Sequence, residues 1–252
     1  MKLSILITLL IYFQVDCLAM ESMRPINMAK KVKFEIEDDV IISADYYTGK
    51  KGSAGVLLLH GCASDSSADV SLSNALYSQG IHALSVNLRG FGESSSAMFS
   101  QEDIKRRSRS LVEYQQDMAI LTSFWDDDLL AAYQFLKVKI GIKQKIAIVA
   151  SGCSSIFAVK LANKVKVSNL VLIEPEMSSA DIEYFKHLFD TPVYFINIGS
   201  NTSSSQTSQE LFAWNNSKHS KLVILKALKG SILHSQQLNE DIASWLQYNF
   251  KQ

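Results

Sequence analysis

The chain has 252 residues with 25 basic and 25 acidic side chains, and 47% of its residues are hydrophobic. This length and apolar content suit one α/β domain with a sizeable core. Because the net charge is zero, there is no electrostatic basis for nucleic-acid binding, and we expect none.

Residues 1–19 predict a secretory signal peptide. Lys2 supplies the positive charge, residues 3–13 form a short apolar run, and residues 17–19 provide a small-residue cleavage site. The apolar run is too short to span a bilayer, and no later segment is long enough to do so. We therefore expect export to the periplasm or outside the cell and one domain over residues 20–252. A lipoprotein anchored at Cys17 is the alternative, which the preceding Asp16 disfavours.

Strands and helices are predicted to alternate along most of the chain. The expected strands are 31–37, 40–47, 55–59, 81–86, 146–150, 170–173, 193–198 and 222–225. The expected helices are 66–79, 125–137, a helix ending at 164, 180–189, 206–214 and 233–248. This alternation implies a mostly parallel central sheet with helices on both faces.

Residues 94–121 interrupt this alternation. The segment is polar and basic, with Lys105, Arg106, Arg107 and Arg109. We expect an insertion over the edge of the sheet. The sequence leaves open whether it forms a lid or a plain surface excursion.

Three motifs follow expected strands. His60 and Gly61 come directly after the apolar strand 55–59, and residues 87–94 read Asn-Leu-Arg-Gly-Phe-Gly-Glu-Ser. Residues 150–155 read Ala-Ser-Gly-Cys-Ser-Ser between a strand and a helix, where a nucleophile elbow is normally written G-x-S-x-G. With these motifs in this order, the chain resembles the α/β-hydrolase fold family over nearly all of its mature length.

The resemblance implies a nucleophile at the elbow, an acid after a later strand and a histidine after the last strand. When the flanking strand and helix are held fixed, Gly152 aligns with the nucleophile. Glycine adopts the strained geometry of this turn, so the turn is kept and the nucleophile is deleted. A second register makes Ser154 the nucleophile but puts Ile156 where the turn favours a small residue. Ser151 is the other candidate serine.

The acid and base positions also differ from the family pattern. The best match to the acid is Asn201, whose amide can hydrogen-bond to imidazole but cannot stabilise imidazolium by charge. Glu174 and Glu176 are displaced alternatives, although loop-surface carboxylates are the simpler interpretation. The family's histidine aligns with Lys229, which could act as a base only if burial lowered its pKa strongly. We expect His234 inside the terminal helix.

The same resemblance assigns the two N–H donors of an oxyanion hole to Cys62 and Cys153. Two N–H groups that converge on one oxygen lie close together, so we expect a Cys62–Cys153 disulfide in an oxidising compartment. Two buried free thiols are the alternative. A metal site is not expected, because two thiols without nearby histidines supply too few ligands.

These substitutions predict an exported protein with the α/β-hydrolase fold that has lost serine-hydrolase catalysis. It would bind a small molecule or a protein, without a cofactor. The alternative is an active esterase, lipase-like or peptidase-like hydrolase that uses Ser154 or Ser151, with Lys229 or His234 as base. Thiol chemistry at Cys62 and Cys153 is a third hypothesis.

Overall fold

The computed structural model describes residues 28–36, 40–226 and 232–252. The predicted signal peptide, Cys17 and Lys229 lie outside these ranges. The described chain forms one eight-stranded sheet in the order β1-β2-β4-β3-β5-β6-β7-β8. The strands are β1 (Ala29–Ile36), β2 (Val40–Tyr47), β3 (Gly55–Leu59), β4 (His82–Val86), β5 (Ile146–Ser151), β6 (Asn169–Ile173), β7 (Val193–Ile198) and β8 (Lys221–Leu225).

Strand direction confirms the predicted, mostly parallel sheet. β2 pairs antiparallel with both β1 and β4, and the remaining neighbours from β4 to β8 pair in parallel. Every residue of β3, β4 and β6 is buried, as expected for strands covered on both faces.

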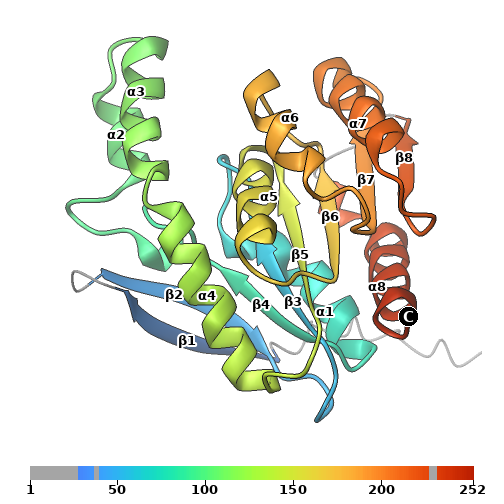
Figure 1. Ribbon diagram of the computed structural model, residues 1–252. Coiled ribbons are helices and arrows are strands. Elements are labelled where there is room, and N and C mark those ends of the chain that lie inside the picture. Colours follow the sequence, from blue (N-terminus) through green and yellow to red (C-terminus); the bar gives the residue numbers. More distant parts are fainter. Residues whose placement is uncertain (1–27, 37–39, 227–231) are drawn as a thin grey trace, which may run out of the picture.

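Helices cover both faces of the sheet, as predicted (Figure 1). α1 and α8 pack on one face, and α4, α5, α6 and α7 lie on the other. The helices are α1 (Val70–Ser78), α2 (Gln101–Arg107), α3 (Leu111–Thr122), α4 (Trp125–Ile140), α5 (Ser155–Lys164), α6 (Ser179–Lys186), α7 (Thr202–Trp214) and α8 (Gln236–Phe250). Each face has its own apolar core, because side chains of successive strand residues point to opposite sides.

The segment predicted as an insertion contains α2 and α3, which extend away from the sheet beyond the start of α4 (Figure 1). Arg89, in the turn after β4, connects the start of this segment to α4. The guanidinium donates two hydrogen bonds to the Asp128 carboxylate of α4, at 2.6 and 3.1 Å. It also lies 5.0 and 4.7 Å from the ring centroids of Phe99 and Phe124.

Within the described ranges, no helix is both long and apolar enough to cross a membrane.

Candidate functional site

Most of the candidate residues follow parallel strands that end at the same edge of the sheet. Cys62 follows β3, Gly152 follows β5, Glu174 and Glu176 follow β6, and Asn201 follows β7. The carboxyl ends of neighbouring parallel strands meet at one edge, where α/β proteins form their ligand crevices. The fold therefore brings together residues that are far apart in the sequence.

Gly152 occupies the sharp turn between β5 and α5. Ser151 ends the strand, one turn of 3-10 helix spans Gly152–Ser154, and α5 begins at the next residue. The φ of Gly152 is +54°, in the left-handed region that favours glycine. A Cβ atom added here would lie 3.4 Å from Oε1 of Glu176, and the Glu176 N–H donates to the Gly152 carbonyl at 3.2 Å. Glu176 thus lies against the residue that the family resemblance aligns with the nucleophile.

The two candidate serines occupy different environments. Ser154 is fully buried, and its Oγ lies 3.1 Å from the Leu59 carbonyl and 3.0 Å from the Ser151 carbonyl, either of which can accept its proton. The same Oγ accepts the Ser151 N–H at 3.1 Å. Ser151 is half-buried, and its side chain accepts the N–H of Ser154 in a capping box. Ser154 is therefore engaged in holding the elbow against β3.

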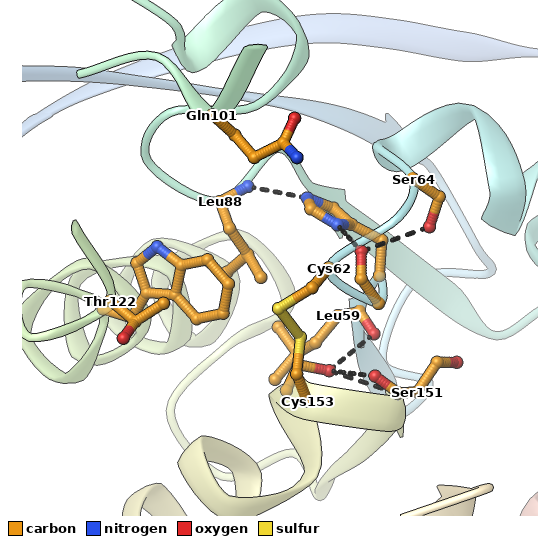
Figure 2. The surroundings of a disulfide bond; sticks show 12 residues. Leu59, Cys62, Ser64, Leu88, Gln101, Thr122, Ser151 and Cys153 are labelled. Atoms are coloured by element: carbon orange, nitrogen blue, oxygen red, sulfur yellow. Dashed lines mark hydrogen bonds between the residues drawn. A yellow bond between two sulfur atoms is a disulfide. The ribbon is translucent and has the colours of Figure 1, made fainter. Parts of the chain in front are cut away.

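Cys62 and Cys153 form a disulfide, which links the turn after β3 to the start of the helix after β5 (Figure 2). Their Cα atoms are 5.9 Å apart, and the two residues are separated by 91 positions in the sequence. Both cysteines are half-buried. The crosslink joins the two residues to which the family resemblance assigns the oxyanion-hole N–H groups.

Asn201 and Glu174 contact one another across the ends of β7 and β6. The Asn201 amide donates to Oε1 of Glu174 at 3.3 Å, and its oxygen accepts the Ser204 N–H at 3.3 Å, which caps α7. Glu174 has a φ of +46°, and it is the only non-glycine residue with a positive φ in the described part of the chain. Such a conformation is uncommon and is associated with functional or structurally constrained positions.

The described histidines near the site make no contact of the kind a catalytic base needs. His60 is buried, with Nδ1 donating to the Gly61 carbonyl at 2.9 Å and Nε2 accepting the Leu88 N–H at 3.1 Å. Burial lowers the pKa of His60 to about 4, so the ring is neutral at pH 7. His234 is exposed at the end of a short 3-10 turn before α8, not inside that helix as predicted.

A pocket of about 420 Å³ collects most of the candidate residues. Its lining includes Cys62, Ser151, Gly152, Cys153, Glu174, Glu176 and Asn201. Ser154 and His234 are not among its lining residues, and Ile232 and Leu233 form part of its wall instead. In the described residues there is no cluster of three or more histidine, cysteine or acidic side chains suited to a metal ion.

Sequence reasoning missed two residues of this pocket, Asp69 and Tyr114. Asp69 is fully buried at the start of α1, and the Ser85 hydroxyl donates to its carboxylate at 2.9 Å. Burial raises the pKa of Asp69 to about 7, although the Ser85 hydrogen bond acts in the opposite direction. An acidic residue at the start of a helix is common, so only the fold could show that this one is buried beside a pocket. Tyr114 comes from α3, whose position the sequence did not determine.

A family model described as the alpha/beta hydrolase fold matches residues 56–250. The chain belongs to this family. No curated protein shows a significant sequence match to it.

Solved structures of α/β-hydrolase esterases and a dienelactone hydrolase share the fold. An esterase from Pyrococcus furiosus is 15% identical, with a TM-score of 0.66 over 88% of this chain and 91% of the other. A dienelactone hydrolase from Anabaena variabilis is 15% identical, with a TM-score of 0.65 over 88% and 98% of the two chains. A carboxyl esterase from Bacillus coagulans is 10% identical, with a TM-score of 0.63 over 88% and 99%. At these identities the likeness concerns the fold, and function depends on the residues of the site.

Proposed function

We propose that this protein is an exported member of the α/β-hydrolase fold family that binds a ligand and has lost nucleophilic serine catalysis. The observation that carries the proposal is Gly152 at the elbow, with the carboxylate of Glu176 against it. Glycine has no side-chain atom that could attack a carbonyl carbon. The carboxylate of Glu176 beside the same point also opposes the negative charge that develops on a tetrahedral intermediate.

The neighbouring serines offer a poor replacement for this nucleophile. The hydroxyl of Ser154 is buried and bonded to backbone groups of β3 and β5, so it does not face the pocket. Ser151 does line the pocket. However, a serine nucleophile needs an adjacent base, and the His60 ring has both nitrogens engaged with backbone groups.

The disulfide supports export, and the pocket supports a binding role. Disulfides persist in oxidising compartments, which agrees with the predicted signal peptide and with delivery to the periplasm or the exterior. A pocket of about 420 Å³ is within the size range of small-molecule sites, and its polar lining provides several hydrogen-bonding groups. A small molecule is therefore the ligand class that the pocket accommodates; a protein could contact the surface around it.

Hydrolysis of short-chain nitrophenyl esters tests the proposal. We expect the mature protein to show no serine-dependent hydrolysis, so that wild type, Ser151→Ala and Ser154→Ala give the same low rate. A folded esterase of the same family, assayed in parallel, controls for substrate quality. A wild-type rate that falls by 100-fold or more in Ser151→Ala would establish the alternative, an active hydrolase with a displaced nucleophile, since loss of a nucleophile costs at least about this much.

A further inference from the structure

The Cys62–Cys153 disulfide lies where two cavities meet. Cys62 borders both the 420 Å³ pocket and an open groove of about 1280 Å³, whereas Cys153 borders only the smaller pocket. Residues of the α2–α3 segment, among them Gln101, Lys105 and Tyr114, form the other side of the groove. A small molecule in the groove can therefore approach the disulfide from the side of Cys62.

The two sulfur atoms also differ as leaving groups. Cys153 is in the turn that leads directly into the ten-residue helix α5, so its sulfur is at the positive end of the helix dipole. Cys62 follows a strand and has no helix behind it. A helix N-terminus stabilises a thiolate, and the sulfur with the more stable thiolate leaves faster in thiol–disulfide exchange.

The carboxylates of the pocket act against this stabilisation of a Cys153 thiolate. Glu174 and Glu176 line the pocket, and their carboxylates would repel a thiolate. Asp69 also lines it, but burial raises its pKa to about 7, so it is partly protonated at neutral pH and repels a thiolate less. His60 is neutral and supplies no compensating positive charge.

Glu176 contacts Gly152, the neighbour of Cys153, so its repulsion opposes the helix N-terminus at that sulfur. The access of the groove to Cys62, and not to Cys153, is the second and independent source of the asymmetry.

We propose that the Cys62–Cys153 disulfide is a thiol-exchange site that takes small thiols from the groove. The thiolate of the small thiol attacks Sγ of Cys62, forms a mixed disulfide there and expels Cys153 as a thiolate. A second thiolate then attacks the thiol-derived sulfur of the mixed disulfide and releases Cys62 as a thiolate. The two small thiols leave joined as their own disulfide, and their two electrons reduce the protein. This chemistry does not depend on whether the serine-hydrolase function is lost.

The direction of attack can be measured on the oxidised, mature protein. Reduced glutathione serves as the small thiol, a large excess of N-ethylmaleimide near neutral pH alkylates the free thiols and stops exchange, and peptide mapping locates each modification. We expect glutathione on Cys62 and maleimide on Cys153, in about tenfold excess over the reverse pattern. Equal amounts of the two patterns, or the reverse preference, would overturn the proposal. So would failure of the folded protein to react under conditions in which the urea-unfolded protein reacts.

The single variants Cys62→Ser and Cys153→Ser test the leaving-group argument separately. Circular dichroism first establishes that both are folded. The pH midpoint for alkylation of Cys153 in the first variant should then lie below that of Cys62 in the second. Equal midpoints would remove the reason for directed exchange, and they would do so without bearing on the serine-hydrolase question.

Discussion

Two constraints act on residue Gly152, one from its backbone and one from a neighbouring side chain. Its positive φ favours glycine whatever the surroundings, and the Glu176 carboxylate limits the space that a side chain could fill. In a working family member the corresponding residue accepts this backbone strain because its side chain performs the chemistry. Glycine adopts the left-handed geometry of this sharp turn easily, which agrees with the proposed loss of the nucleophile.

Gly152→Ala is expected to destabilise the protein by about 1–2 kcal/mol, because an L-residue pays for the left-handed conformation. Gly52→Ala is the matched control for the cost of the left-handed backbone alone, since Gly52 has a φ of +81° and nothing within 4 Å of an added Cβ. Urea unfolding under oxidising conditions measures both. If Gly152→Ala were as stable as wild type, the elbow would not have the strained geometry on which the alignment of this position rests.

Asp69 should make stability depend on pH. Its pKa is about 7 when folded against about 4 when unfolded, so the folded state holds the proton more tightly. This contribution is complete below about pH 4 and is lost as pH rises to about 7, by up to about 4 kcal/mol. Asp69→Asn keeps an acceptor for Ser85 and removes the titration. Its stability relative to wild type should therefore increase from pH 5 to pH 8, as measured by urea unfolding. A constant difference would show that Asp69 does not titrate in this range.

At the scale of elements, the period of apolar residues predicted most helices and strands but placed some of their ends wrongly. The helix expected at 206–214 begins at Thr202, because Asn201 caps it. Residues 202–205 are all polar, so the period of apolar residues gave no signal for this first turn. The terminal helix begins at Gln236, after Ser235 caps it, which leaves His234 outside. Side-chain capping sets the first residue of both helices. In a sequence, a capping residue is a weaker signal than the period of apolar residues.

The sequence predicted the insertion that contains α2 and α3, but it did not predict how this segment is attached to the rest of the molecule. Its connection to the body depends on Arg89 meeting Asp128 between two phenylalanine rings, which no local pattern reveals.

Asp128→Ala should destabilise the protein by about 3–5 kcal/mol, because it leaves the buried Arg89 guanidinium without its counter-charge. Asp126→Ala is the matched control from the same first turn of α4. Asp126 pairs with Lys164 at 3.4 Å near the surface, so its loss should cost no more than about 1 kcal/mol. Chemical denaturation of both variants measures the difference. Equal losses would mean that the buried ion pair does not anchor the segment.

At the scale of the whole molecule, alternation of strands and helices was enough to predict the layered sheet. The close pairing of Cys62 and Cys153 followed from the family resemblance, since their separation in sequence is large. The buried Asp69 and the contribution of Tyr114 required the complete fold, because both depend on contacts between distant segments.

The double variant Cys62→Ser/Cys153→Ser should lose about 4 kcal/mol of stability, because the crosslink restricts a long loop of the unfolded chain. The loss should equal that produced by reducing the wild type, and reductant should not affect the variant further. Urea unfolding with and without reductant measures this. A variant as stable as the oxidised wild type would show that the crosslink does not constrain the molecule.

Covalent labelling of the mature protein with a fluorophosphonate tests the loss of serine catalysis most directly, since the probe reacts with activated serines. Intact mass reports the stoichiometry, and peptide mapping finds the site. We expect no adduct under conditions that fully label a control esterase. A stoichiometric adduct on Ser151 or Ser154 would contradict the account and identify the protein as an active hydrolase.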